Sequence, residues 1–169
     1  MIRPIRRYGD SILHSPAQPV HEITAEIDVL IRDMIETMYA APGIGLAATQ
    51  VGVPLRIVVI DVSVGRDPSG LLTLLNPEFV EREGMQLEGE GCLSLPGFNA
   101  TVARPQRATL KALDPSGRER VVEGVGLLAR ALQHEMDHLD GRVFVEHLRG
   151  IKRDLILRKI RKQMRQGKW

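Results

Sequence analysis

The order of the predicted elements indicates an α+β fold. An amphipathic helix comes first, several short segments of β character follow, and two further helices end the chain. Helices that are separated from a run of consecutive strands favour antiparallel sheets over alternating β-α-β units. The chain has 169 residues, of which 43% are hydrophobic and 26% are charged, and this is sufficient for one hydrophobic core. We therefore expect residues 1–169 to form a single domain.

The first predicted element is a helix that begins after Thr24. A threonine at this position can accept a hydrogen bond from the first helical turn. Apolar residues then recur at helical spacing and define one face of the helix. This apolar face consists of Ile27, Leu30, Ile31, Met34 and Met38.

Four strands are expected after this helix. Residues 56–62 and 71–79 are short apolar runs that contain Ile, Val and Leu. Residues 108–113 and 118–123 flank the turn Asp114-Pro115-Ser116-Gly117, whose residue types favour a tight connection between antiparallel strands. All four strands precede the helix that carries the most informative motif.

This motif is H-E-x-x-H, at residues 134–138. On a helix, His134 and His138 lie on one face, where both imidazoles can bind the same metal ion. Glu135 would lie beside the ion and within reach of a water molecule whose proton it can accept. Gly141 follows as a helix stop signal. The pattern predicts a metallohydrolase; the alternative is a surface helix that carries two histidines by chance.

The third metal ligand does not follow from this motif. The longer signature H-E-x-x-H-x-x-G-x-x-H would require a ligand at Phe144, which cannot bind metal. A protease site with two histidines and a carboxylate would need Glu146 or Asp154, and Glu146 is close in sequence to the histidines. Cys92 is the only cysteine and lies in E-G-C-L-S-L-P, which predicts an irregular loop. By itself it fits a buried, inert thiol better than a metal ligand.

A third motif changes this interpretation. Residues 43–50 read G-I-G-L-A-A-T-Q, which alone indicates no more than a turn before a strand. Taken in order, G-x-G-L-A-A-x-Q, E-G-C-L-S and Q-H-E-x-D-H resemble peptide deformylase. The resemblance extends from the first residues to the helical C-terminus. It implies antiparallel sheets around a central H-E-x-x-H helix, with N-terminal and C-terminal helices and a metal between that helix and the cysteine loop.

The resemblance also implies an activity and a metal site. Members of this family remove the N-formyl group from the N-terminal formylmethionine of newly made proteins and release formate. The implied ligands are Cys92, His134 and His138, with a fourth position left for water, as a catalytic site requires. The resemblance implies one Fe²⁺ per chain. Zn²⁺, Ni²⁺ or Co²⁺ can substitute, because a thiolate and two imidazoles suit all of these ions. A thiolate donates more charge to the ion than a third imidazole or a carboxylate does, and this lowers the Lewis acidity of zinc. We therefore expect the zinc form to be the weaker catalyst.

Further site residues are implied at positions that match the family motifs. Glu135 would carry the proton from the water to the leaving nitrogen. The side-chain amide of Gln50 and the backbone N–H of Leu93 would stabilise the developing charge on the carbonyl oxygen. A substrate-binding pocket for the methionine is implied along Ile44, Gly45, Leu127 and Ala131.

Three charged residues near these motifs are open to two interpretations. Glu90 and Arg104 match positions that pair in the family and would then fix the cysteine loop. The alternative is that both are solvated surface charges. Arg130 falls near the substrate face, and its head can reach either solvent or the substrate backbone while its stem packs.

Charge is distributed unevenly along the chain. Residues 149–169 carry nine Lys or Arg and one Asp, a local charge of +8 in a chain whose net charge is +2. A basic amphipathic helix is expected at about 149–166. It either packs on the core as an ordinary solvated helix or contacts ribosomal RNA through its charge.

The remaining features suggest where the protein works. The N-terminus has no apolar run long enough for a signal peptide, and no segment approaches a membrane span. A single cysteine excludes an internal disulfide and fits a reducing compartment. We expect a cytoplasmic monomer without membrane contact. A metalloprotease and a non-catalytic ribosome-binding relative are the alternatives, although the latter would not need to keep Glu135 and Gln50.

Overall fold

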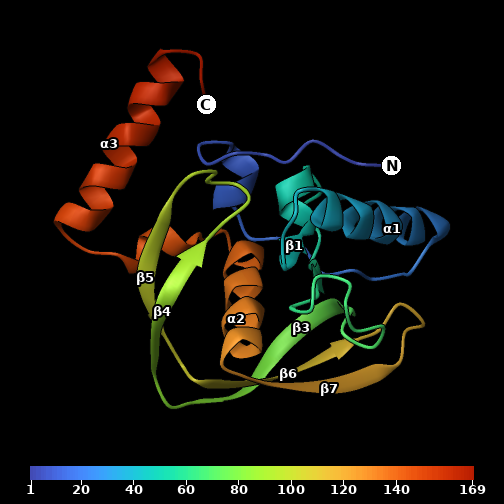
Figure 1. The fold of residues 1–169 in the computed structure, drawn as a ribbon. Coiled ribbons are helices and arrows are strands. Elements are labelled where there is room, and N and C mark those ends of the chain that lie inside the picture. Colours follow the sequence, from blue (N-terminus) through green and yellow to red (C-terminus); the bar gives the residue numbers. More distant parts are fainter.

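Antiparallel sheets and three α-helices make up the computed structural model, which describes residues 1–169 (Figure 1). The helices are α1 (Ala25–Ala40), α2 (Leu127–Leu139) and α3 (Ile151–Arg165). Short 3₁₀ helices lie at Ser11–His14, Ala48–Val51 and Phe144–His147. This mixed architecture agrees with the predicted fold class. None of the helices combines the length and the apolar character that crossing a membrane would require.

The strands form two separate sheets. The larger sheet has the order β1-β2-β3-β6-β7, and the smaller one is the hairpin β4-β5. The strands are β1 (Gly45–Ala47), β2 (Ile57–Ile60), β3 (Leu72–Glu83), β4 (Gln86–Gly91), β5 (Asn99–Arg104), β6 (Arg107–Leu113) and β7 (Glu119–Val125). The four expected strands correspond to β2, β3, β6 and β7.

Strands β1, β4 and β5 were not predicted. In β4, two glycines and two glutamates occupy four of the six positions, and these residue types are depleted in strands. The strand forms because every residue from Gln86 to Gly91 pairs with a partner in β5. The expectation of an irregular loop around Cys92 is therefore wrong for Glu90 and Gly91, which end β4, and the turn begins only after them.

Strand β2 shows why its sequence is apolar without alternation. All four of its residues are buried, because both faces of the strand are covered. Ile57 and Val59 belong to a core cluster that includes the apolar face of α1. Val58 and Ile60 belong to a second cluster that includes Leu132 of α2. The continuous Ile and Val run is the pattern expected for a strand between two layers.

Helix α1 follows its prediction closely. The Thr24 side chain accepts a hydrogen bond from the Ile27 N–H at 3.3 Å, which caps the first turn. All five residues of the predicted apolar face are buried. The expected cap and the expected face are both confirmed.

Helix α2 carries the H-E-x-x-H motif and is largely buried. Ten of its thirteen residues are inaccessible, and the helix contacts β1, β2, β6 and β7. It ends at the predicted stop, where Gly141 has φ of 76°. A Cβ at Gly141 would lie 2.8 Å from the backbone of Ser15, so close packing as well as conformation requires glycine. Figure 1 shows α2 beside the β4-β5 hairpin.

Helix α3 lies apart from the other helices, at the edge of the molecule (Figure 1). Its range agrees with the helix expected at about 149–166. Only Ile160 is buried, in a cluster with Phe144 and Leu148 from the segment between α2 and α3. The helix therefore packs on the rest of the protein mainly through Ile160, and most of its surface faces solvent.

Candidate metal centre

The three predicted ligands lie together in the structure. Cys92 follows β4, whereas His134 and His138 project from α2. The distance from Cys92 Sγ to His138 Nε2 is 3.3 Å, and that from His138 Nε2 to His134 Nε2 is 3.2 Å. Ligands that bind one tetrahedral ion at about 2.0–2.3 Å lie roughly 3.3–3.7 Å from each other. All three ligand atoms fall within 4.8 Å of one another, so the residues fit a metal ion.

The two histidines differ in what holds them. His134 Nδ1 lies 2.7 Å from Glu90 Oε2, and this contact directs Nε2 towards Cys92 and His138. His138 Nδ1 is buried and has no hydrogen-bond partner. The orientation of His134 therefore depends on Glu90, whereas that of His138 depends on packing.

The surroundings of Cys92 favour the thiolate form of its side chain. Burial of the thiol favours its neutral form and raises its pKa, but the neighbouring His138 and His134 outweigh burial and lower the pKa to about 5. The pKa of His134 is raised in turn: burial would lower it, but the hydrogen bonds with Cys92 and Glu90 prevail. At neutral pH the thiol is thus in the form that binds metal.

Glu135 lies next to this cluster without being part of it. Its side chain is buried, and its Oε2 has no hydrogen-bond partner within the protein. Burial raises the pKa of this carboxyl group. Room for it comes from Gly45, where a Cβ would lie 2.5 Å from Glu135 Oε1. The arrangement leaves a carboxylate free to accept a proton from a molecule in the cavity.

Gln50 and Leu93 line the same cavity. Gln50 Oε1 accepts a hydrogen bond from the Ala47 N–H at 2.9 Å, which fixes the amide. Its Nε2 then points at Ser94 Oγ, at 3.1 Å, and at Cys92 Sγ, at 3.8 Å. The Leu93 N–H donates to no backbone carbonyl. The structure therefore places the Gln50 amide, and Leu93 with an N–H that no backbone carbonyl accepts, at the cavity that contains Cys92.

The cavity has a volume of about 760 Å³, which is within the usual range of about 300–1,000 Å³ for small-ligand sites. Its lining includes all four residues that were expected to bind the substrate methionine: Ile44, Gly45, Leu127 and Ala131. Ala131 is buried, whereas Leu127 is 53% exposed. These four residues share one cavity with Cys92, His134 and Glu135.

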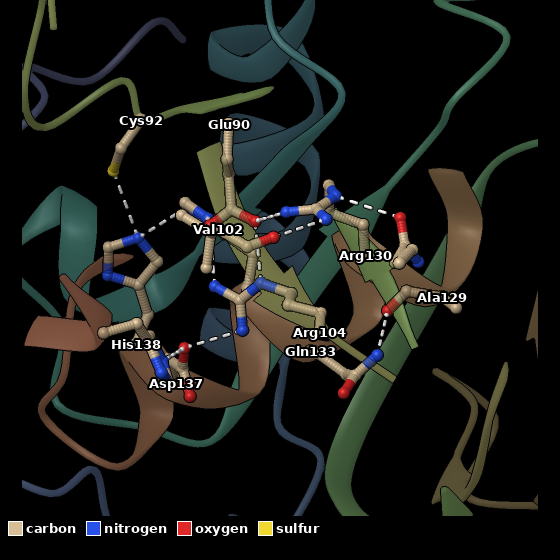
Figure 2. A network of polar contacts seen from close by, with 12 residues as sticks. Glu90, Cys92, Val102, Arg104, Ala129, Arg130, Gln133, Asp137 and His138 are labelled. Atoms are coloured by element: carbon tan, nitrogen blue, oxygen red, sulfur yellow. Dashed lines mark hydrogen bonds and ion pairs between the residues drawn. The ribbon is translucent and has the colours of Figure 1, made fainter. Parts of the chain in front are cut away.

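Glu90 and Arg104 form a buried ion pair, so the interpretation of both as surface charges is wrong (Figure 2). Their side chains are 5% and 4% exposed, and Arg104 donates to both carboxylate oxygens of Glu90 at 2.7 and 2.6 Å. Burial alone would raise the pKa of Glu90, but the hydrogen bonds from Arg104 and His134 lower it. Arg104 also contacts Asp137 at 3.0 Å, and Asp137 contacts His147 at 2.7 Å.

Arg130 also belongs to this buried network, and its guanidinium group contacts protein acceptors instead of bulk solvent (Figure 2). It is 3% exposed and donates to Glu90 Oε1 at 2.8 Å, to Gln86 Oε1 at 3.1 Å and to the Val102 carbonyl at 2.7 Å. The expectation of a head in solvent is wrong, because the unpredicted β4-β5 hairpin supplies these acceptors. Arg130 also lines the cavity, so a contact with the substrate backbone stays a prediction. The sequence feature that could have indicated this placement is the four-residue spacing between Arg130 and His134.

Known proteins are similar to this chain over nearly its whole length. A family profile described as polypeptide deformylase matches residues 2–154. The peptide deformylase of Acidobacterium capsulatum is 48% identical over 169 residues, which cover 100% of this chain and 99% of that protein. The peptide deformylase of Thermodesulfovibrio yellowstonii is 47% identical over 160 residues, 95% of this chain and 97% of that protein.

Solved structures extend this agreement to the fold. The crystal structure of a peptide deformylase from Legionella pneumophila superposes with a TM-score of 0.92 at 43% identity and covers 99% of this chain and 98% of that one. The peptide deformylase of Ehrlichia chaffeensis in complex with actinonin gives a TM-score of 0.88 at 37% identity, with 96% and 97% covered. On sequence and structure together, this chain belongs to the polypeptide deformylase family.

Proposed function

We propose that this protein is a hydrolase that removes the N-formyl group from the N-terminal formylmethionine of newly synthesised proteins and releases formate. The observation that carries the proposal is a single cavity that combines Cys92, His134 and Glu135 with an apolar wall. A formyl group can enter such a cavity beside the methionine side chain of the same residue. The membership of the family supports the same reaction.

Cys92, His134 and His138 would hold one Fe²⁺ per chain, with Zn²⁺, Ni²⁺ or Co²⁺ as substitutes. The spacing of the three ligand atoms and the low pKa of Cys92 support a divalent ion here. Such an ion supplies Lewis-acid chemistry that lets water act as a nucleophile at neutral pH. Iron is proposed on the family resemblance. The site is a three-ligand site, which is typical of catalytic rather than structural metals.

Glu135 would accept the proton of the attacking water and deliver it to the leaving nitrogen. Its unpartnered Oε2 supports this role, because the oxygen has no competing hydrogen bond to break. The raised pKa supports it as well, because a higher pKa makes the carboxylate a stronger proton acceptor. Protonation of the nitrogen is necessary because an amine anion leaves poorly.

Gln50 Nε2 and the Leu93 N–H would donate to the carbonyl oxygen as negative charge develops on it. Both residues line the cavity that contains Cys92, and Gln50 is already oriented by Ala47. Donors fixed before the reaction need no reorganisation during it, which is why one of them is typically worth about a hundredfold or more in rate.

The substrate methionine would lie along Ile44, Gly45, Leu127 and Ala131. The apolar side chains of three of these residues suit a thioether chain, and Gly45 lets the substrate backbone approach closely. We also propose that the two sheets surround the H-E-x-x-H helix so that its histidines face the turn after β4. Residues 1–169 would then act as one catalytic domain.

The basic C-terminal segment supports a contact with ribosomal RNA. All nine basic residues of the segment 149–169 are exposed. None of them takes part in an ion pair within the protein. Their charge is therefore available to a polyanion. A cytoplasmic monomer that meets nascent chains at the ribosome is consistent with this arrangement.

The proposal is tested by measuring formate release from a formyl-Met peptide, with metal analysis on the same sample. The same peptide without the formyl group, and a longer one with internal peptide bonds, are the comparison substrates. Formate release from the formylated peptide alone is expected. Cleavage of internal bonds instead would indicate a metalloprotease, and a metal-loaded protein without either activity would indicate a non-catalytic relative.

A further inference from the structure

Arg130 and His134 bind the same carboxylate from one helix. They are four residues apart on α2, so they lie on one face, one turn from each other. Arg130 Nη1 donates to Glu90 Oε1 at 2.8 Å, and His134 Nδ1 contacts Glu90 Oε2 at 2.7 Å. The carboxylate thus bridges a guanidinium and an imidazole on successive turns. Figure 2 shows the Arg130 side of this bridge.

Glu90 has no free acceptor position left. Each of its oxygens makes two contacts: Oε1 with Arg104 Nε and Arg130 Nη1, and Oε2 with Arg104 Nη2 and His134 Nδ1. A carboxylate offers about four lone-pair directions, so these four contacts fix its position and its plane. Arg104 alone would leave Oε1 with one donor, and Arg104 is also drawn towards Asp137 at 3.0 Å.

Arg130 is itself held firmly. Its Nε donates to Gln86 Oε1 in β4, and its Nη2 donates to the Val102 carbonyl in β5. Gln86 Nε2 in turn donates to the Gly126 carbonyl at 2.9 Å, at the start of α2. The guanidinium therefore joins the first turns of α2 to both strands of the hairpin that carries Glu90. No part of this linkage lies at the surface, because Arg130 and Gln86 are both buried.

We propose that Arg130 is a positioning residue for the metal centre: it clamps Glu90 so that His134 keeps its Nδ1 on Glu90 and its Nε2 facing Cys92 and His138. The inference rests on the metal site proposed above. It assigns to Arg130 an effect on the metal that acts through Glu90 and not through contact with the substrate or the ion. His138 gives an internal contrast, since its Nδ1 has no partner and Arg130 cannot influence it in this way.

Cobalt is a suitable probe, because Co²⁺ with thiolate and imidazole ligands has visible absorption bands that report on its geometry. Arg130→Gln removes the charge and leaves one short donor, whereas Arg130→Lys keeps the charge but cannot reach all three acceptors. Gln133→Met is the matched control. Gln133 lies beside His134 on α2, is equally buried, and donates to the Pro105 and Ala129 carbonyls without touching Glu90.

For each variant, the rate of Co²⁺ release to a chelator, the visible spectrum and the melting temperature of the metal-free protein are measured. Loss of a residue that orients a metal ligand typically weakens binding by about 10–100-fold. We expect Arg130→Gln to release Co²⁺ about tenfold or more faster than wild type, with shifted bands, and Arg130→Lys to fall between the two. Gln133→Met is expected to melt earlier but to keep the wild-type release rate and spectrum.

Two results would overturn the inference. One is an Arg130→Gln protein with the release rate and spectrum of wild type. The other is a release rate that follows the melting temperature alone, so that Gln133→Met and the Arg130 variants fall on one line. If Arg130→Gln does not fold, Arg130→Lys decides by the same comparison with Gln133→Met. A wild-type protein that binds no Co²⁺ would instead contradict the proposed metal site itself.

Discussion

Helices α2 and α3 are similar in length, with 13 and 15 residues, but opposite in their surroundings. In α2 ten residues are buried, including Arg130, His134 and Glu135, whereas in α3 only Ile160 is buried. The polar groups of α2 lie where the dielectric is low, so each interaction is strong and each needs a partner. The basic groups of α3 lie in water, where their effect is long-range and weakened by salt. The comparison separates a helix whose polar groups are buried among partners from one whose charged groups are exposed to solvent.

The largest effect is expected at the unpartnered carboxylate of α2. Glu135→Gln removes the proton acceptor but keeps the size of the side chain, so formate release should fall about 10²–10⁴-fold while the metal content stays unchanged. Turnover and metal content are measured on one preparation. A variant that loses its metal, or that keeps near-wild-type turnover, would show that Glu135 is not the proton carrier.

A second test concerns the side-chain donor beside Cys92. Gln50→Glu keeps the acceptor for the Ala47 N–H but replaces the Nε2 donor by an oxygen, so the fold should hold while kcat falls about a hundredfold or more. The measurement is kcat and KM on a formyl-Met peptide. An unchanged kcat with only a higher KM would mean that Gln50 binds substrate rather than stabilising developing charge.

The third prediction concerns how the sensitivity of the buried site to air depends on the metal that it holds. Iron beside the Cys92 thiolate places two oxidisable partners together, so iron-loaded enzyme should lose activity in air several times faster than nickel-loaded or cobalt-loaded enzyme. Half-lives are compared under equal aeration. Equal half-lives for the three metals would locate the sensitivity elsewhere.

The smallest effect on activity is expected from α3. Exchange of Arg158, Lys159, Arg161 and Lys162 for Gln leaves the packing around Ile160 intact, so activity on a short peptide should stay within twofold of wild type. Cosedimentation with ribosomes should weaken at low salt and lose much of its salt dependence. Binding as tight as that of wild type at both low and moderate salt would identify α3 as a structural helix only.

Removal of the whole helix is a less clean test than charge exchange. The Trp169 indole donates to the Tyr8 carbonyl at 2.7 Å and packs against Phe98, with ring centroids 5.9 Å apart. Phe98 lines the cavity beside the metal centre. Truncation after Gly150 would therefore disturb both the charge and the cavity wall, and only the Gln variant distinguishes the two.

Local patterns account for the parts of the fold that were predicted. The apolar face of α1, its Thr24 cap and the end of α2 at Gly141 depend on residues within a few positions of each other, so periodicity and turn chemistry suffice. The hairpin β4-β5 depends on pairing between its two strands, and the composition of β4 opposes β structure. Its existence is decided by partners and could not be predicted from the segment itself.

The candidate reactive groups could be identified from the residue pattern: two histidines and a glutamate at helical spacing, one thiol, and a resemblance that linked Cys92 to them. How these groups are held follows only from the fold. The acceptors of Arg130 lie 28 residues away at Val102 and 44 residues away at Gln86, in a hairpin that was not predicted. The physical reason is that a charged side chain can remain buried only where partners are already in place, and those partners come from folding rather than from neighbours in the chain.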